Sequence, residues 1–574
     1  MKKCNYIVIG LLGLGLLCSC ELTLEPEDTI SPNNYFKKAA DLELWCNGYY
    51  TQLAAANDAA GSNADDMIDN SLGDLMMGQR SAADESAWTW TMLRKINYYF
   101  ENSGDCQDAD AKKQYDGVSH FMRAYFYWIK VRRYGAVPWY DEVILSDDYS
   151  QLRKAREDRG IIMDNIMADL DKAIDLLPTK KDNVHVTKWT ALALKCRVAL
   201  YEGTFRKYHS LGNADKYLRL AAEAAELFIN DSGYKLYTTG TQPYRDLFNS
   251  IDAVSDEIIL TRKYSATANV LHSVQFNIKN DRAGFTKRLV NHYLMKDGSF
   301  YSSQADYDKK IFTEEVANRD PRLEQTILCP GYIQTGASKV TANNLNALTG
   351  YQPIKYVNGT AYDGSNKSYT DFPLFRAAEV FLNFAEAKAE LGTLTQADLD
   401  KSINKIRDRV KMPHLDLATA NATIDPLMSE YYPNVTKSNN TGVILEIRRE
   451  RTVELALEGF RIWDILRWKE GQQLTKPFYG CYFPGEGEYD MDGDGKADLL
   501  LYTTNKGNFK GTAKQIGKDV ILSEGTKGFI HAIPTISVTW NENRDYLWPI
   551  PASERVLSGG ALTQNPGWED STNF

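Results

Sequence analysis

The sequence predicts an all-α protein built from tetratricopeptide-like pairs of helices, interrupted by long irregular insertions and a few short strands. Two observations support this fold class. Apolar and small residues recur at helical spacing in successive segments, such as 112–134 and 187–206. Between groups of such segments, long stretches are rich in Gly, Asn, Ser and Tyr and show no sustained period. No clean 34-residue repeat is visible, so we expect the helical pairs to be irregular.

The first residues of the chain have the pattern of a lipoprotein signal peptide. Two lysines precede an apolar run at 6–17, which is too short to span a bilayer, since that takes roughly 20 residues. Cys20 follows at the expected cleavage site, in a stretch that resembles a bacterial lipoprotein box. We therefore expect residues 1–19 to be a signal peptide and 20–34 to be a tether, held on a membrane through acyl chains such as palmitate on Cys20. Ordinary secretion with an unmodified cysteine is the alternative.

The composition excludes several classes of protein. The formal net charge is -10, and loss of the signal peptide would remove two lysines and no acidic residue, which gives -12. An acidic chain repels phosphate backbones, so nucleic acid is not an expected partner. The five cysteines after Cys20 are widely spread and form no Cys-x-x-Cys pair. Neither a disulfide framework nor a thiolate zinc site is therefore expected.

The helices are predicted in chain order. The first helical pattern begins at Tyr35, and a second follows Trp90 and runs through Phe100. Alanines at contact positions let helix axes approach closely, and the whole of 35–574 is interpreted as one domain. Further amphipathic segments predict helices at 112–134, 159–177, 187–206, 213–230, 374–392, 396–411 and 443–469.

Three insertions separate these helices, at about 60–110, 231–372 and 470–545. Apolar runs such as that at 257–260 indicate a few short strands within them. Loops of this length are uncommon inside a compact body unless they carry function. A helical scaffold that displays loops suits a binding protein, and we expect the first two insertions to bind the ligand.

Aromatic residues beside polar loops are the candidates for ligand contact. Trp88 and Trp90 adjoin the polar loop 60–87, and the face of an indole ring stacks on the C–H face of a sugar ring. Nearby Asp or Arg side chains can bind sugar hydroxyls. The alternative is that both tryptophans anchor the loop in the core. The candidate ligand-binding residues are Asp74, Arg80, Trp88, Trp90, Tyr264 and Tyr301.

The segment 490–498, DMDGDGKAD, is the sharpest local motif. Its carboxylates stand at positions 1, 3 and 5 of a tight loop, and a glycine at position 6 supplies the turn of an EF-hand-like calcium site. Position 12 is Leu501 where an EF-hand has a bidentate Glu, so affinity should be weaker. An Asp/Gly turn without metal is the alternative. The candidate ligands of a structural Ca²⁺ are Asp490, Asp492, Asp494, the carbonyl of Lys496, and Asp498.

Catalytic motifs are missing from the sequence. It contains neither His-Glu-x-x-His nor Gly-x-Ser-x-Gly, so it gives no positive reason to expect an enzyme. In the segment 443–469, Glu454 and Glu458 are expected to share a helix face, with Arg461 three residues further on. Together with Arg451 and Asp464 they predict an ion-pair network that locks this helix, and a ligand clamp is the alternative.

Seven sequence blocks, in family order across nearly the whole chain, resemble the SusD/RagB family of Bacteroidetes surface lipoproteins. The most specific block is IRRERTVELALEGFR, and the lipoprotein box agrees with the same family. The blocks are 120–127, 134–138, 318–323, 375–387, 447–461, 547–554 and 564–567.

The resemblance implies a fold and a function. The fold would be four tetratricopeptide-like helical pairs in a right-handed superhelix, with an irregular ligand-binding face. The protein would be a non-catalytic, lipid-anchored lipoprotein of the outer membrane and cell surface, which binds a glycan during polysaccharide utilisation and nutrient uptake. It would act as a lid on a SusC-like TonB-dependent transporter. A peptide-binding lid of a RagA-like transporter and a surface glycan hydrolase remain as alternatives.

Overall fold

The computed structural model describes residues 35–60, 64–70 and 72–568. The predicted signal peptide at 1–19, the tether at 20–34 and the lipidation site Cys20 lie outside these ranges.

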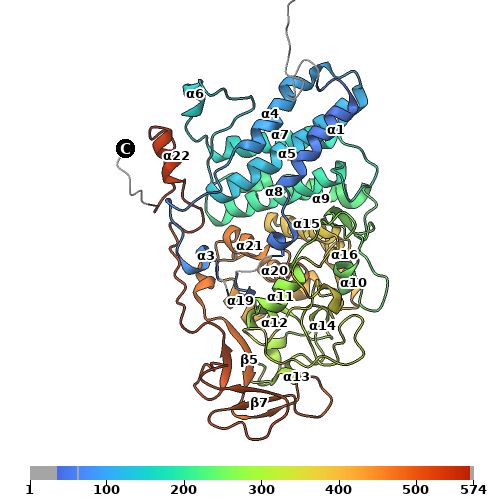
Figure 1. Ribbon diagram of the computed structural model, residues 1–574, viewed down its shortest axis with the longest axis vertical. Coiled ribbons are helices and arrows are strands. Elements are labelled where there is room, and N and C mark those ends of the chain that lie inside the picture. The colour runs from blue at the N-terminus through green and yellow to red at the C-terminus, as the bar shows by residue number, and fades with distance from the viewer. Residues whose placement is uncertain (1–34, 61–63, 71, 569–574) are drawn as a thin grey trace, which may run out of the picture.

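Most of the long helices form one end of the molecule, shown at the top of Figure 1, and they confirm the predicted all-α class. Their ends follow local sequence signals. The helix at 109–134 begins where the Asp108 carboxylate accepts the Ala111 N–H, and it ends at Gly135, which has a φ of 74°. The long helices are α1 (Ala39–Asn47), α4 (Thr91–Asn102), α5 (Ala109–Tyr134), α7 (Arg159–Leu176), α8 (Lys188–Tyr208), α9 (Ala214–Asp231), α15 (Ala377–Leu391) and α20 (Thr441–Glu454).

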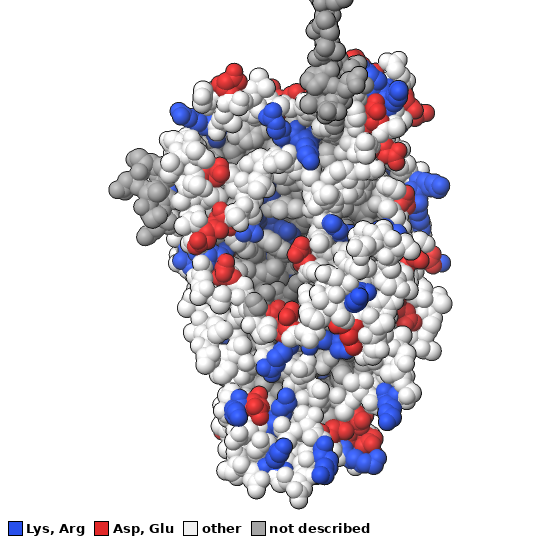
Figure 2. Space-filling view, in the orientation of Figure 1, with Lys and Arg blue, Asp and Glu red and all other residues white. Residues whose placement is uncertain are grey.

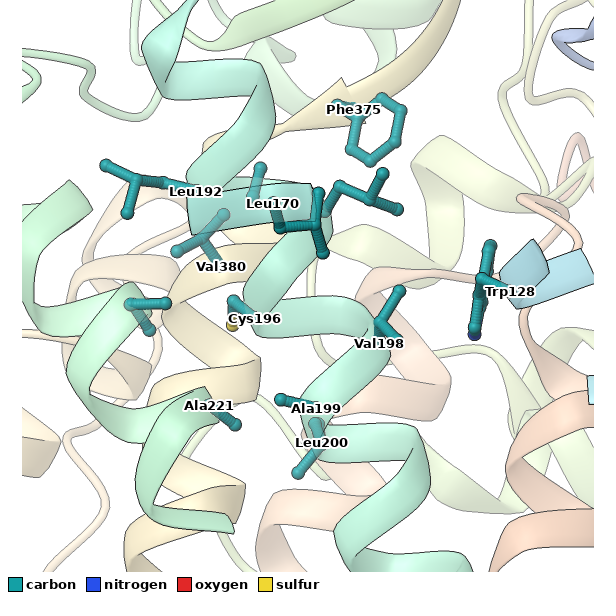
Figure 3. Packing of buried hydrophobic residues seen from close by; sticks show 14 of the residues in the cluster. Trp128, Leu170, Leu192, Cys196, Val198, Ala199, Leu200, Ala221, Phe375 and Val380 are labelled. Atoms are coloured by element: carbon teal, nitrogen blue, oxygen red, sulfur yellow. The ribbon is translucent and has the colours of Figure 1, made fainter. Parts of the chain in front are cut away.

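Consecutive long helices pack side by side as pairs, as the sequence predicts. α5 packs on α7, α8 on α9, and α15 on both α9 and α20. Figure 3 shows part of the resulting core, where Leu192 and Cys196 of α8 lie near Val380 of α15. The α8–α9 contact is close because a Cβ at Gly203 would lie only 2.8 Å from Leu218 Cγ. Small residues therefore set the helix spacing, as expected for tetratricopeptide-like pairs.

Three predicted helices differ from the structure. The helix expected at 443–469 ends at Glu454 and resumes as α21 (Arg461–Arg467), because Leu457 and Gly459 adopt positive φ values of 61° and 75°. The segment 396–411 is divided into α16 (Gln396–Asp400) and α17 (Ile403–Arg409). The start of 374–392 is a strand, because it pairs with a strand of the second insertion.

The strands are short, and those of the described residues occur in four small sheets. β2 (Ile258–Arg262) pairs antiparallel with β4 (Phe372–Arg376) and joins the second insertion to α15. The three-stranded sheet and the sheet of β5 and β9 form the lower end of the molecule in Figure 1. The remaining strands are β1 (Met67–Ile68), β3 (Gly284–Phe285), β5 (Tyr479–Phe483), β6 (Gly487–Tyr489), β7 (Leu499–Tyr502), β8 (Thr512–Gln515) and β9 (Gly528–His531).

Short helices punctuate the insertions, and the last of them, α22, returns to the helical end near α6 (Figure 1). Across the described ranges, no helix is both long enough and apolar enough to cross a membrane. The short helices are α2 (Ala56–Ala59), α3 (Asp74–Met77), α6 (Tyr149–Leu152), α10 (Pro243–Asn249), α11 (Val274–Asn280), α12 (Lys287–His292), α13 (Phe312–Glu315), α14 (Arg322–Thr326), α18 (Leu417–Ala422), α19 (Pro426–Tyr431) and α22 (Ala552–Leu557).

A buried ion-pair network links the helical end to the insertions. It contains the residues predicted to form such a network, but most of them pair with other segments rather than with one another. The Glu454 carboxylate at the end of α20 accepts hydrogen bonds from Arg376, Arg409 and Arg322. Burial opposes ionisation of this carboxyl, but the three guanidinium groups lower its pKa. Arg461, at the start of α21, instead pairs with Asp65 at a distance of 2.6 Å. These ion pairs hold together segments that are far apart in the sequence.

Candidate functional site

Trp88 and Trp90 lie together just before α4, but they differ in exposure. Trp88 is 7% exposed and packs edge to face against Tyr134 in the main core. Trp90 is half-buried, and its ring meets those of Trp88 and Tyr140 at steep angles of 74° and 83°. The two indoles therefore do not form one flat platform, and Trp90 offers more ring surface than Trp88.

Both indoles line a cavity of about 370 Å³ at the helical end. One wall comes from α4 and the loop after α5, which contributes Tyr140. The opposite wall comes from α22 and the residue Leu562. The volume lies within the range typical of small-molecule sites. Segments separated by about 400 residues thus meet around an aromatic-lined pocket.

Asn97 lines this cavity and carries a buried, unpaired hydrogen-bonding group. Its Nδ2 donates to the carbonyl oxygens of Tyr140 at 3.1 Å and Glu142 at 2.9 Å, which fixes the orientation of the amide. Among the described residues, none donates to its buried Oδ1. An unpaired buried acceptor is costly, so a ligand hydroxyl that donates to it would be favoured.

Charged side chains of both signs surround the aromatic lining. Arg94, Glu142, Lys154 and Glu554 all line the cavity. Arg94 donates to the Ile144 carbonyl, and Lys154 donates to the Trp139 carbonyl at 2.8 Å. Burial raises the pKa of Tyr140 to about 12, so its hydroxyl stays protonated at neutral pH. The pocket therefore combines apolar rings with both donors and acceptors and suits a neutral polyhydroxy ligand.

The structure places two further candidates, Arg80 and Asp74, outside the cavity. Arg80 is held by Asp545, at 3.0 Å, and lies over the rings of Trp548 and Trp568. Its guanidinium is thus occupied by contacts with the C-terminal segment. Asp74 is exposed on α3 and does not line the cavity.

The burial of Tyr264 and Tyr301 contradicts the prediction that they contact the ligand. Tyr301 is 1% exposed, and its hydroxyl donates to the Tyr307 carbonyl at 2.8 Å. Tyr264 is 8% exposed, and its hydroxyl accepts the N–H of Ala56 at 2.9 Å. Both rings are buried, so neither presents a free face to a ligand.

The acidic loop predicted to bind calcium joins β6 to β7. Carboxylate oxygens of Asp490, Asp492 and Asp494 lie within 4.8 Å of one another. Partial burial and then the neighbouring carboxylates raise the pKa of Asp492, which a cation would oppose. Asp498 instead accepts the Met491 N–H at 3.0 Å, and the Lys496 ammonium pairs with Asp494 at 3.0 Å. Calcium binding at this loop stays a prediction.

The fold and pocket together define a tetratricopeptide-like protein with long insertions and an aromatic-lined surface cavity. Figure 2 shows Lys and Arg interspersed with Asp and Glu over one face, so no patch of a single sign dominates that face.

The family model described as "SusD family" matches residues 257–568, and one described as "Starch-binding associating with outer membrane" matches 77–200. The chain belongs to the SusD family.

Individual relatives agree with this assignment. Two SusD-like proteins of Formosa agariphila are 23% and 24% identical; the first alignment covers 84% of this chain and 95% of the relative, and the second covers 99% and 100%. A SusD-like protein from Bacteroides fragilis is 24% identical, with a TM-score of 0.67 over 95% of this chain and 100% of that one.

Two more solved structures share the fold. A SusD-like carbohydrate-binding protein from Bacteroides fragilis has a TM-score of 0.66 at 18% identity and covers 91% of this chain and 98% of its own. A crystal structure determined with xylogluco-oligosaccharide has a TM-score of 0.61 at 17% identity and covers 93% and 100%.

Sequence reasoning found Trp88 and Trp90 but missed the rest of the pocket. Tyr140, Asn97 and Leu557 were not singled out, because they come from distant segments that only the fold brings together. The Gly-Ala-Val-Pro sequence at 135–138 marked the turn that carries Tyr140. The amide of Asn97, on the buried side of α4, gave no comparable signal.

Proposed function

We propose that this protein is a non-catalytic, glycan-binding lipoprotein that captures an oligosaccharide or polysaccharide at the Trp90 cavity. The observation that carries this proposal is the combination of a half-buried indole with an unpaired buried acceptor, Asn97 Oδ1, in one cavity. A sugar ring has apolar C–H faces that stack on aromatic rings, and its hydroxyls donate to acceptors.

The finer role rests on the family. We propose that Cys20 anchors the protein to the outer membrane at the cell surface, and that it acts as a lid which delivers glycan to a SusC-like TonB-dependent transporter. Membership of the SusD family and the family description of starch binding associated with the outer membrane support this role. Replacement of Cys20 by Ala should abolish incorporation of labelled palmitate and release the protein from the membrane fraction.

The first experiment is affinity electrophoresis of the mature chain without its lipidated Cys20, residues 21–574, in gels that each contain one polysaccharide. Retardation by a polymer, together with loss of that retardation in Trp90→Ala, would support glycan capture at the cavity. Trp45→Ala is the matched control, because Trp45 is also half-buried and packs on α4 at Tyr98, but does not line the cavity.

Two other outcomes would redirect the proposal. Absence of retardation together with saturable binding of short peptides would favour the peptide-binding lid. Release of reducing sugars by the purified protein would establish a hydrolase instead.

A further inference from the structure

A second cavity, of about 170 Å³, lies on the opposite face of α5 from Trp90. Residues of α5 that pack near Trp90 include Phe126 and Tyr127, whereas Trp128 and Arg132 line the second cavity. Its other walls come from β4, the start of α15 and the start of α21. Figure 2 shows a hollow in the molecular face at the level where Figure 1 places α15 and α21.

Arg132 lies in this cavity between two indole rings. Its guanidinium carbon is 4.3 Å from the ring centre of Trp128 and 3.7 Å from that of Trp463. Within the described part of the chain no carboxylate forms an ion pair with it, and its Nε has no hydrogen-bond partner. The indole N–H of Trp128 is also buried without a partner there.

The other arginines of the cavity differ from Arg132 in this respect. Arg197 pairs with Glu379 at 2.6 Å, and Arg376 pairs with Glu458 at 2.7 Å. These pairs use the two buried carboxylates of the lining. The remaining lining carboxylate, on Asp58, belongs to an exposed residue for which the structure shows no ion pair.

The surroundings of Arg132 leave a positive charge uncompensated. Burial lowers its pKa to about 10, and the nearby cations Arg197 and Arg133 act in the same direction. The group therefore remains charged at neutral pH. Ring faces attract a cation, but a partly buried charge without a counter-ion is still less favourable than a hydrogen-bonded pair. An anion that entered the cavity would complete the missing pair.

We propose that this cavity is a second binding site, which takes the carboxylate of a sugar acid such as a hexuronate. The planar guanidinium fork of Arg132 matches a carboxylate. Asp58 at the rim can accept a sugar hydroxyl. The cavity is smaller than is typical of small-molecule sites, so it would take no more than one sugar unit. The choice of a sugar acid rests on the glycan-binding function proposed above.

The test is calorimetric titration of the mature chain with sodium glucuronate, with glucose and sodium acetate as matched ligands at constant ionic strength. We expect saturable binding of glucuronate and at least tenfold weaker binding of glucose and acetate. Arg132→Gln should weaken glucuronate binding by at least about tenfold, and Arg132→Lys should retain part of it. Arg153→Gln, which removes an exposed arginine outside both cavities, should leave it unchanged.

Thermal unfolding of the same variants shows whether each of them is folded. If Arg132→Gln fails to fold, the titrations of the wild-type protein and of Arg132→Lys still test the proposal. Equal affinity for acetate and glucuronate, binding of peptides through Arg132, or absence of glucuronate binding would each overturn this proposal. Retardation by neutral polysaccharides that depends on Trp90 would then still stand, so failure at Arg132 is distinguishable from failure of glycan capture.

Discussion

Arg376 and Glu458 form a two-point ion pair, with Nε 2.7 Å from Oε2 and Nη2 2.8 Å from Oε1. Arg376 ends β4, and Glu458 lies in the turn between α20 and α21. The same guanidinium reaches Glu454 through Nη1 at 2.7 Å. Glu454 and Glu458 thus meet at one arginine across a break in the helix, rather than along one helix face as the sequence predicts.

Replacement of Glu454 by Gln should lower the free energy of unfolding by about 3–5 kcal/mol, because it leaves buried guanidinium groups without their shared carboxylate. Urea denaturation followed by fluorescence would measure the change. Asp171→Asn is the control, since Asp171 pairs with Lys195 at an exposed position, and it should cost less than about 1 kcal/mol. Similar effects of both variants would contradict the structural role of the network.

Glu386 should make stability depend on pH in the acid range. Burial opposes its ionisation, but Arg467 and then Arg451 lower its pKa from 4.5 to about 2. A lowered carboxyl pKa means that the stabilisation is fully present above about pH 4.5 and is lost as the pH falls toward 2. The loss from this group would be about 3 kcal/mol. Denaturation between pH 2 and 6 should therefore show a flatter profile in Glu386→Gln, and parallel profiles would disprove the assignment.

Trp90 and Trp88 should respond differently to truncation. Trp90→Ala should weaken glycan binding by about tenfold with little loss of stability, because its exposed ring surface faces the cavity. Trp88→Ala should lower the free energy of unfolding by about 3–5 kcal/mol, because its ring is buried in the core. Melting curves and affinity electrophoresis on the same samples would separate the two effects. A binding defect confined to Trp88→Ala would reverse the assignment.

Calcium should stabilise the loop between β6 and β7. We expect Ca²⁺ to raise Tm by a few degrees and excess chelator to reverse the change, since ligand binding to the folded state alone adds stability. Asp490→Asn should abolish the response, whereas Asp519→Asn, an acidic residue outside the converging cluster, should retain it. A Tm that is unaffected by either addition would support the metal-free turn.

The sequence predicted the periodic helices well because one buried face is enough to define them. The helix expected at 112–134 is found at Ala109–Tyr134. The break after Glu454 was missed, although Gly459 was a visible turn signal, because Leu457 also adopts a positive φ and nothing in its side chain indicates this.

Candidate site residues were harder to predict, because exposure is a tertiary property. Tyr301 is an aromatic residue in a polar stretch, as expected of a ligand contact, yet it lies in the core. Trp90, by contrast, retains an accessible ring. Two aromatic residues in similar polar stretches thus differ in exposure, and only the packing of distant segments determines which ring a ligand can reach.

The wall that α22 gives to the Trp90 cavity has a consequence for synthesis and engineering. Residues 88–154 cannot form the complete pocket until residues 554–562 have been synthesised and have folded back onto them. A chain shortened before residue 550 would lack one side of the pocket and also Ile550 and Leu562, which are buried in the main core.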